Sequence, residues 1–483
     1  MSPPSTLVWF RNDLRLADNP ALWEAVERGA PVVPVFIMQE AGEKYGSPGG
    51  AGRWWLHYSL HSLDADLRRA GSRLIVRTGD PLSVLRQVAE ECHAEAVFWN
   101  RRYEPAAVAC DAEVKAEFRA RGLTIESFNG SLLYEPWQVL NQEEKPYRVF
   151  TPFWKACLAL REPGSPLPEP AHIPAPEIWP VSLPIEQLHL EPKIGWAQGL
   201  RAAWTPGSEG AGGNLGVFLD EALEGYETGR DRPDRQGTSR LSPYLRFGEI
   251  SPRQVWRAVR EFSKNEARTR LAGSAQAFLR QLGWREFAYY LLFHFPYTPD
   301  QPLDGNFAAF PWREDREALT AWQKGRTGYP YIDAGMRELW HTGWMHNRAR
   351  MGVASFLVKD LLIPWQAGAA WFWDTLVDAD LANNTLGWQW TAGCGADAAP
   401  YFRVFNPVSQ GEKFDPEGRY VRAWVPELAN LPGRWIHKPW EAPERELKKA
   451  GVELGKDYPY PMVDHAAARL RALELYQNLK KPS

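Results

Sequence analysis

The stretch DADLANNTLGWQW, residues 378–390, brings acids, amides and indoles close together. Two carboxylates lie two residues apart, and two adjacent amides and then two Trp follow them. A twelve-residue calcium loop that began at Asp378 would need Gly sixth and Glu twelfth, where this chain has Asn383 and Gln389. Calcium binding is therefore excluded, while simple packing of the two Trp in a core remains open.

A second stretch, GTSRLSPYL at 237–245, is typical of a helix N-terminus, with Thr238 and Ser239 predicted to cap it. Free backbone N–H groups, two hydroxyls and Arg240 together would suit a diphosphate. An ordinary capped helix is the alternative. An aromatic side chain and a cation that could face the same anion come shortly upstream, Tyr226 and Arg230.

A third stretch, GWMHNRARM at 343–351, is predicted to be helical and gathers four polar residues within five positions: His346, Asn347, Arg348 and Arg350. A charge run of this kind is more often a solvated helix face, and a lone His is more often a hydrogen-bonded core group. Asn347 and Arg350, however, lie three apart and share a face. On the inner face Arg350 would need a buried carboxylate, which Asp378 or Asp380 could supply.

A fourth stretch, residues 401–428, interleaves aromatic residues with Arg403, Gln410 and Lys413. Such a mixture can stack bases and hold phosphates. A polar loop between helices explains it equally well, so this pattern alone decides nothing.

The first 130 residues provide part of the scaffold for these side chains, and their sequence alternates between two patterns. Short apolar runs at 6–10, 31–38, 73–78, 95–100 and 123–128 predict strands. Amphipathic stretches at 19–29, 53–70, 81–91 and 105–121 predict the helices between them. The alternation predicts a doubly wound parallel sheet, which binds ligands at the carboxyl ends of its strands. No G-x-G-x-x-G follows the first strand, so a dinucleotide bound in the Rossmann manner is not expected there.

The rest of the chain is predicted to be a Pro-rich connector followed by helices. Residues 161–192 are rich in Pro and show no sustained periodicity, as expected for a connector over the surface. From about 200 to 478 apolar residues recur at helical spacing, which predicts an almost all-α domain. The predicted domains are 1–135 (α/β), 136–200 (connector) and 201–483 (helical).

The composition narrows the class of protein. At 483 residues the chain is long enough for two or three domains, and the net charge of −3 argues against a histone-like nucleic-acid binder. Four Cys lie far apart without a C-x-x-C, so no disulfide framework and no metal site are predicted. No signal peptide and no apolar run of membrane length is found, so we expect a cytoplasmic enzyme away from the membrane. The 24 Trp exceed what packing alone calls for.

Taken together, the motifs resemble those of the DNA photolyase and cryptochrome family. The resemblance runs in order from about residue 6 to residue 430. It rests on LVWFRNDLRLADNPAL, GTSRLSPYL, WREF, TGYPYIDAGMREL, GWMHNRARM, FLVKDLL, DADLANN, GWQW and DAAPYFRVFNPVSQGEKFD. It implies an α/β antenna-pigment domain, a long connector, and a helical domain that binds FAD in a folded shape.

The resemblance also implies which residues hold FAD. Arg350 would pair with Asp378, and Asn384 would lie against flavin N5. The full set of implied cofactor residues is Tyr226, Arg230, Thr238, Ser239, Arg240, Leu241, Ser242, Asn347, Arg350, Asp378, Asp380 and Asn384.

Three Trp are implied to relay an electron from the surface to the photoexcited flavin. Trp388 would lie next to the flavin, Trp365 would follow, and Trp312 would be outermost. Indole suits this task because it can lose an electron transiently without an acid or base beside it.

The implied activity is light-driven repair of cyclobutane pyrimidine dimers in DNA, a carbon–carbon lyase reaction in which reduced, excited FAD lends an electron to the dimer. Trp284 and Trp390 match the aromatic walls of the pocket that receives the flipped-out dimer. The implied DNA and substrate residues are Gln281, Trp284, Arg285, Asn347, Arg348, Met351, Trp390 and Gln410.

A cryptochrome-type photoreceptor without repair activity is the alternative. The pair His346-Asn347 replaces the His pair usual in six-four photolyases, which argues against that lesion. Gln281 stands where dimer photolyases usually have Glu, which favours the photoreceptor mildly. The antenna pigment is expected to be methenyltetrahydrofolate, with a deazaflavin as the other choice, and the protein is expected to be a monomer.

Overall fold

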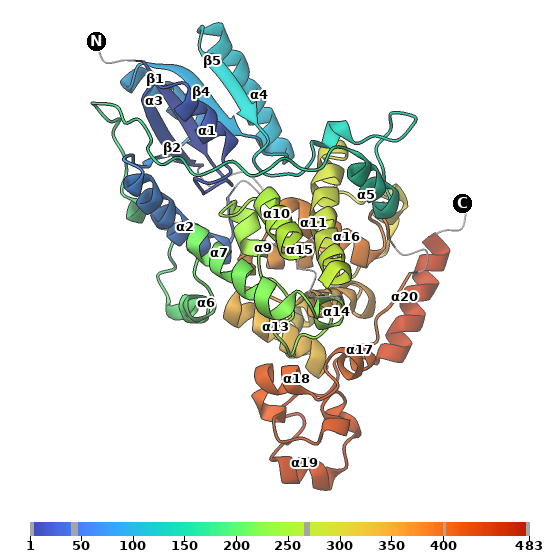
Figure 1. Ribbon diagram of the computed structural model, residues 1–483. Coiled ribbons are helices and arrows are strands. Elements are labelled where there is room, and N and C mark those ends of the chain that lie inside the picture. Colours follow the sequence, from blue (N-terminus) through green and yellow to red (C-terminus); the bar gives the residue numbers. More distant parts are fainter. Residues whose placement is uncertain (1–3, 40–46, 265–270, 399–401, 480–483) are drawn as a thin grey trace.

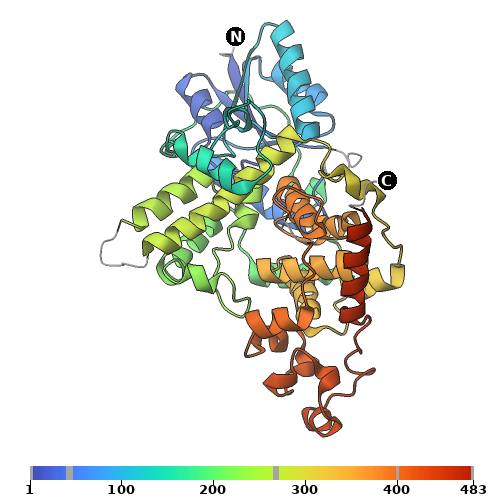
Figure 2. The same ribbon diagram turned by 90° about the vertical axis from the view of Figure 1, so that its right-hand side faces the viewer.

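The computed structural model describes residues 4–39, 47–264, 271–398 and 402–479. A sheet with its flanking helices occupies one end of the molecule, and the helical remainder lies below it (Figure 1). Figure 2 shows the same stacking from the side, with the red helix α20 (His465–Leu479) beside orange helices of the lower part.

The sheet has five parallel strands in the order β3-β2-β1-β4-β5. Their bounds are β1 Ser5–Phe10, β2 Val32–Met38, β3 Ile75–Thr78, β4 Ala94–Asn100 and β5 Thr124–Phe128. All six residues of β1 are buried, because parallel strands are covered on both faces and therefore read as continuous apolar runs. The five predicted strands are confirmed.

Two helices cover each face of the sheet: α1 (Pro20–Glu27) and α2 (Gly50–Arg69) share one apolar cluster with it, and α3 (Pro81–Glu91) and α4 (Pro105–Ala120) share the other. The starts of two of them are set locally. Asn19 accepts from the backbone N–H of Leu22 before α1, and Pro20 follows as the first helical residue. Asp80 caps α3 in the same way, accepting from Ser83 N.

Part of the connector lies on the surface, and part of it packs into the core. Residues 161–184 contain neither helix nor strand, as predicted. Before them, however, helix α5 (Phe150–Ala159) buries Phe150, Trp154 and Cys157 in the large apolar cluster. Short 3-10 turns complete the connector, η1 Pro136–Gln138, η2 Ile185–Leu188 and η3 Gly195–Ala197.

The remainder is helical among the described residues, with one isolated bridge between Leu454 and Tyr458 as its only β pairing. The predicted fold class is confirmed. No helix of the described residues is both long and apolar enough to span a bilayer. The elements are α6 Gln198–Ala203, α7 Ser208–Val217, η4 Phe218–Ala222, α8 Tyr226–Gly229, α9 Ser242–Phe247, α10 Pro252–Phe262, α11 Leu271–His294, η5 Gly305–Ala309, α12 Arg316–Gln323, α13 Pro330–Thr342, α14 Asn347–Ser355, η6 Phe356–Asp360, α15 Trp365–Thr375, α16 Leu381–Ala392, α17 Pro407–Phe414, α18 Arg419–Trp424, η7 Pro426–Leu428, η8 Gly433–Trp435, η9 Pro439–Glu441, α19 Glu444–Ala450 and α20.

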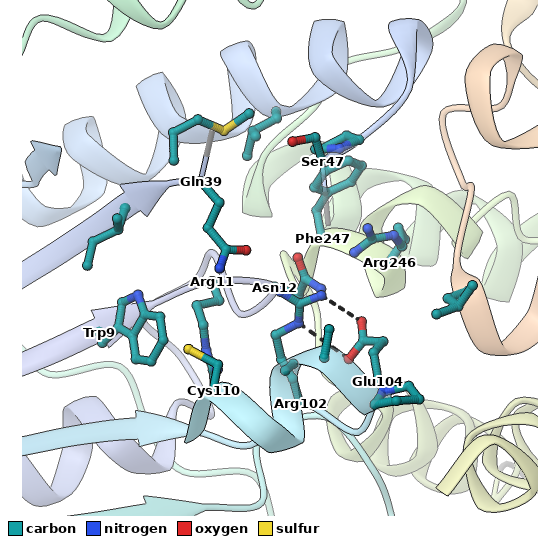
Figure 3. Close-up of a pocket in the computed structure, with 18 of the residues that line it drawn as sticks. Trp9, Arg11, Asn12, Gln39, Ser47, Arg102, Glu104, Cys110, Arg246 and Phe247 are labelled. Atoms are coloured by element: carbon teal, nitrogen blue, oxygen red, sulfur yellow. Dashed lines mark hydrogen bonds and ion pairs between the residues drawn. The ribbon is translucent and has the colours of Figure 1, made fainter. Parts of the chain in front are cut away.

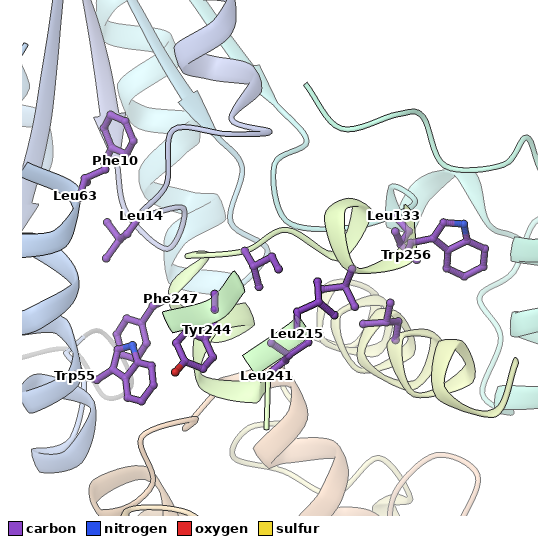
Figure 4. Packing of buried hydrophobic residues seen from close by; sticks show 14 of the residues in the cluster. Phe10, Leu14, Trp55, Leu63, Leu133, Leu215, Leu241, Tyr244, Phe247 and Trp256 are labelled. Carbon is purple, nitrogen blue, oxygen red and sulfur yellow. The ribbon is translucent and has the colours of Figure 1, made fainter. Parts of the chain in front are cut away.

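The sheet and the helical part share one apolar core (Figure 4). The Trp55 ring of α2 meets Tyr244 of α9 edge-on, with 5.0 Å between ring centroids. Beside it, the buried Glu249 carboxyl group accepts from Trp55 Nε1 at 3.1 Å and from Gly207 N at 2.7 Å. Burial raises the pKa of Glu249 to about 8. These contacts fix the orientation of one part against the other, while the exact domain boundaries stay a prediction.

One local prediction is wrong. Thr238 and Ser239 do not cap a helix: α9 begins at Ser242, and its N-cap position is Leu241, which makes no side-chain capping bond. Arg240 has a φ of +51°, a left-handed conformation that a helix cannot include. Pro243 in the first turn then sets the start of α9. Residues 238–241 are therefore a turn in front of the helix.

Candidate functional site

The turn before α9 exposes the groups that the sequence singled out for an anion. Thr238, Ser239 and Arg240 are half-buried, Leu241 is buried and Ser242 is exposed. Arg240 lies between two indoles, with its guanidinium carbon 4.3 Å from the Trp204 ring centroid and 5.0 Å from that of Trp344. Its Nε is buried and has no hydrogen-bond partner among the described residues. A cation held in this way is available to a ligand anion.

Trp344 contacts three of the predicted cofactor residues, although its sequence context gave no signal of this. Besides Arg240, its ring lies 5.9 Å from the Arg350 guanidinium carbon. Its Nε1 donates to Ser242 Oγ at 3.3 Å. The indole therefore ties the turn before α9 to helix α14, two segments about a hundred residues apart.

The predicted ion pair of Arg350 is present. Its Nη2 lies 2.7 Å from Asp378 Oδ2, and its Nε donates to Met345 O at 2.8 Å. Asp378 is buried, and its second oxygen, Oδ1, has no hydrogen-bond partner in the described parts of the chain. A buried carboxylate oxygen without a donor is costly, so a donor from a ligand would stabilise it.

Asp380 and Asn384 lie at the start of α16. Asp380 is the N-cap, accepting from Asn383 N at 2.8 Å, and the Tyr289 hydroxyl also donates to it. Asn384 is half-buried and donates from Nδ2 to Ala369 O at 3.0 Å. The carboxylate oxygens of Asp380 are thus already engaged by the protein, in contrast to those of Asp378.

Tyr226 and Arg230 lie on and just after α8, which packs on α11. Tyr226 is buried against Phe278, with 5.3 Å between ring centroids, and burial raises its pKa to about 12. Arg230 stacks over the Tyr226 ring at 5.4 Å and donates from Nη2 to Gln281 Oε1 at 3.0 Å. A predicted cofactor residue thus directly contacts a predicted substrate residue.

Of the three predicted relay Trp, two are buried and one is half-buried. Trp388 and Trp365 are each 2% exposed, and Trp312 is half-buried. Helix α15 starts at Trp365 and packs on α16, which carries Trp388. A Cβ on Gly368 would lie 2.0 Å from the Trp388 ring, so glycine is needed for this close approach. Trp312 packs on Phe310, with 4.4 Å between centroids.

The predicted aromatic walls are both half-buried. Trp284 of α11 stacks flat on Phe150 of α5, with centroids 3.9 Å apart and planes 7° apart. Trp390 of α16 donates from Nε1 to Asp397 O at 3.1 Å. Arg285, predicted to face DNA, donates to Ser131 O at 2.8 Å, across to the segment that follows β5.

The remaining predicted DNA residues lie on α14 and α17, which pack on each other. Asn347 is exposed, and Arg348, Met351 and Gln410 are half-buried. Arg348 forms an ion pair with Asp231, with 2.8 Å from Nη2 to Oδ1. The fourth stretch that the sequence singled out, 401–428, begins at residue 401, which is outside the described residues.

His346 is a structural residue in this arrangement. It is buried, and its Nδ1 accepts from Arg348 N at 3.1 Å, so it caps α14 instead of lying within the helix. Burial lowers the pKa of His346 to about 4, which keeps it neutral at pH 7. Across the described ranges of the chain, no cluster of three or more His, Cys, Asp or Glu side chains is suited to a metal ion.

A cavity of about 220 Å³ lies at the carboxyl ends of the parallel strands, between the sheet and the helical part (Figure 3). Arg11, Asn12, Gln39 and Arg102 line it from the sheet side. Arg246 lines it from the helical side, where it is 8% exposed and its Nη1 lacks a hydrogen-bond partner among the residues described. The cavity is partly open, and its lining mixes Arg and amide side chains with the Glu104 carboxylate, which pairs with Arg102, so it favours a polar ligand.

Comparison with known proteins agrees with this arrangement. The family model described as DNA photolyase matches residues 6–174, and the one described as FAD binding domain of DNA photolyase matches residues 278–478. A parallel-sheet domain joined to a helical FAD-binding domain defines the class of this protein: it is a flavoprotein. The chain belongs to the DNA photolyase family, whose relatives here include plant cryptochromes.

Two sequence relatives and one solved structure illustrate the likeness. The chain is 51% identical to the deoxyribodipyrimidine photo-lyase of Agrobacterium fabrum, over 98% of both chains. It is 43% identical to cryptochrome-1 of Arabidopsis thaliana, over 96% of this chain and 69% of the cryptochrome. The crystal structure of a bacterial class III photolyase from Agrobacterium tumefaciens superimposes with a TM-score of 0.95 at 50% identity, covering 100% of this chain and 99% of that one.

The residues present fit FAD. The buried oxygen of Asp378 and the Arg240 Nε both lack partners in the described chain. Two hydroxyl side chains, Thr238 and Ser239, stand half-buried in the turn before Arg240. Hydroxyls, a cation and a carboxylate that needs a donor are the groups that a flavin and its diphosphate would satisfy.

Proposed function

We propose that this protein repairs cyclobutane pyrimidine dimers in DNA, using light absorbed by reduced FAD: it is a deoxyribodipyrimidine photo-lyase. When bound and reduced, FAD supplies the electron that opens the cyclobutane ring and takes it back afterwards. The similarity to a photolyase over the whole chain carries the proposal. The chain's own residues hold the cofactor, receive the lesion and exclude water.

The cofactor is held from two sides in this proposal. Thr238, Ser239, Arg240, Leu241 and Ser242 bind the diphosphate and neighbouring atoms, with Tyr226 and Arg230 at the same end. Asn347, Arg350, Asp378, Asp380 and Asn384 face the flavin. The ion pair of Arg350 with Asp378 supports this role, because it leaves Asp378 Oδ1 able to accept a hydrogen bond from the ring system.

The lesion is received as a flipped-out dimer. An already distorted, weakly stacked pair costs less to extrude than an intact one. Trp284 and Trp390 form the walls, Gln281, Asn347 and Gln410 read the edge, and Arg285, Arg348 and Met351 complete the DNA contacts. The half-buried state of both Trp supports the pocket, since each keeps part of its ring open to a ligand.

We also expect the protein to act as a monomer in the cytoplasm.

The decisive experiment illuminates the purified, reduced protein with an oligonucleotide that carries one thymine dimer. Restored bases are followed by the recovery of absorbance. A photolyase restores the bases only in light. A protein that undergoes the light reaction of its flavin but restores no bases would be a photoreceptor of the cryptochrome type, the alternative that Gln281 favours mildly.

The antenna pigment is methenyltetrahydrofolate in this proposal, with a deazaflavin as the alternative. The cavity at the carboxyl ends of the strands would hold its polar ring, and the unpaired Nη1 of Arg246 would bind an acceptor on it. Extraction of the native protein distinguishes the two pigments by mass. Loss of the pigment, but not of FAD, in Arg11→Ala would place it in this cavity.

Trp344→Leu is expected to weaken FAD binding about three- to five-fold, because Arg240 loses one of its two flanking rings and Ser242 loses a donor. Dissociation of FAD is followed by its fluorescence on dilution. Trp344→Phe keeps a ring and should recover most of the affinity. Trp340→Leu, on the neighbouring helix α13, should leave it unchanged. Equal losses in both Leu variants would contradict the assignment.

Arg348→Ala is expected to weaken binding of damaged and undamaged duplex alike, about three-fold, and to reduce the slope of log K against log salt by about 1. The reason is that Arg348 would meet a phosphate and no base. Asp231→Ala is the matched control: it frees Arg348 from its ion pair and should strengthen both affinities. A changed preference for damage at unchanged affinity would overturn this role for Arg348.

A further inference from the structure

The connector reaches both aromatic walls of the proposed lesion pocket. At one wall, Phe150 lies face to face with Trp284, with ring centroids 3.9 Å apart and planes 7° apart. Phe150 is fully buried, at 0% exposure, whereas Trp284 is half-buried. One face of Trp284 is thus covered by a residue more than 130 positions away in the chain.

At the other wall, the same connector segment reaches Trp390 indirectly, through hydrogen bonds to the backbone of Asp397. Trp390 Nε1 donates to Asp397 O at 3.1 Å, and Asp397 N donates to Arg148 O at 3.1 Å. Asp397 has a φ of +50°, a conformation that costs a non-glycine residue energy and persists only where its surroundings hold it. The bond to Arg148 is one such restraint.

Helix α5 is itself held firmly on α11, which carries Trp284. A Cβ on Gly283 would lie 2.7 Å from the Trp154 ring, so the two helices touch at a glycine. Phe150 also meets Phe287 of α11 edge-on, at 5.9 Å between centroids, and the Arg280 guanidinium carbon lies 5.1 Å from the Phe150 ring centroid. Besides Trp284, Phe150 thus contacts Phe287 and Arg280 of the same helix, and these contacts restrain the plane of its buried ring.

We propose that residues 148–150 of the connector are a positioning element for the lesion pocket, in which Phe150 sets the plane of Trp284 and the Arg148 carbonyl, through Asp397, sets that of Trp390. The inference rests on the proposed function. The two rings must stand at a fixed separation and tilt to accept a dimer and reject a normal pair. The element therefore determines preference for damage. It contributes nothing to FAD binding or to phosphate contacts.

The test uses the full-length protein with FAD bound and two duplexes of one sequence, with and without a single thymine dimer. Phe150→Leu keeps an apolar side chain at this buried position and removes the ring. The ratio of the two affinities is expected to fall roughly three- to ten-fold, the equivalent of one aromatic pair. Affinity for the undamaged duplex and FAD content should stay within about two-fold. In repair by the reduced protein, KM for the dimer should rise while kcat stays unchanged.

Four further variants make the result decisive. Phe150→Tyr keeps the stack and should restore the ratio, and Leu158→Ala, an exposed truncation on the same helix, should not change it. Phe150→Met serves as a second ring-free variant if Phe150→Leu does not fold. Trp284→Ala is measured beside them. If Trp284→Ala abolishes the preference and the ring-free Phe150 variants keep it, the positioning role is wrong. If Trp284→Ala also keeps it, the lesion pocket is wrong and the positioning role with it.

Discussion

Replacing Trp365 or Trp388 by Phe is expected to block photoreduction of the oxidised flavin by several orders of magnitude, while repair by protein reduced beforehand continues. Phe is much harder to oxidise than Trp, so a single Phe interrupts the relay. Repair itself passes the electron between flavin and dimer and returns it, which needs no relay. The two activities should therefore separate.

The measurement follows bleaching of oxidised flavin under blue light with an external reductant, and then repair after chemical reduction. Trp256→Phe is a matched control, since Trp256 is also buried with an Nε1 that lacks a partner among the described residues, as Trp388 does. Its photoreduction should be normal. If Trp365→Phe or Trp388→Phe also abolishes repair by the reduced protein, the Trp is structural and no relay member.

Gln281→Glu is expected to raise the efficiency of repair about ten-fold, the equivalent of roughly 1–2 kcal/mol for a charge-assisted hydrogen bond. In the natural protein the Gln281 amide accepts from Arg230 at 3.0 Å and donates to Ala277 O at 3.2 Å. A carboxylate would keep Arg230 on one oxygen and offer the second to a thymine N–H. The neutral amide still has an acceptor, so the natural protein should repair measurably.

Quantum yield and KM for the dimer substrate are compared in the natural protein, Gln281→Glu and Gln281→Leu. The Leu variant should fall below the natural protein, because it can neither accept from thymine nor hold Arg230. If the natural protein shows no repair and Gln281→Glu gains it, the natural protein is a photoreceptor. Absence of repair in both proteins would refute the proposal that this protein is a photolyase.

The strands and their order of appearance could be read from the sequence because parallel strands are buried on both faces. A run such as residues 6–10 is too short for a typical helix and rich in β-branched and aromatic residues, which favours a covered strand. The caps that the structure shows at Asn19 and Asp80 likewise depend only on neighbouring residues. At residues 238–239 local reasoning failed, because the left-handed turn at Arg240 and Pro243 outweighed two good capping side chains.

The pairing of Arg350 with a carboxylate could also be anticipated, since a buried guanidinium requires one. The spacing of the residues left Asp378 and Asp380 as equal choices, and only the family resemblance pointed to Asp378. The structure distinguishes them, because Asp380 is consumed in capping α16 while Asp378 faces Arg350.

What remained hidden were contacts between segments far apart in the chain. Trp344 bridging Arg240 and Arg350, Phe150 against Trp284, and Arg246 at the cavity leave no periodic or spacing signal, because each depends on how whole helices pack. The sequence by itself therefore determined the elements, the family and the chemistry of the individual side chains. Only the tertiary structure decided which of them meet, because packing distances between distant segments are set by the shared core and by no local pattern.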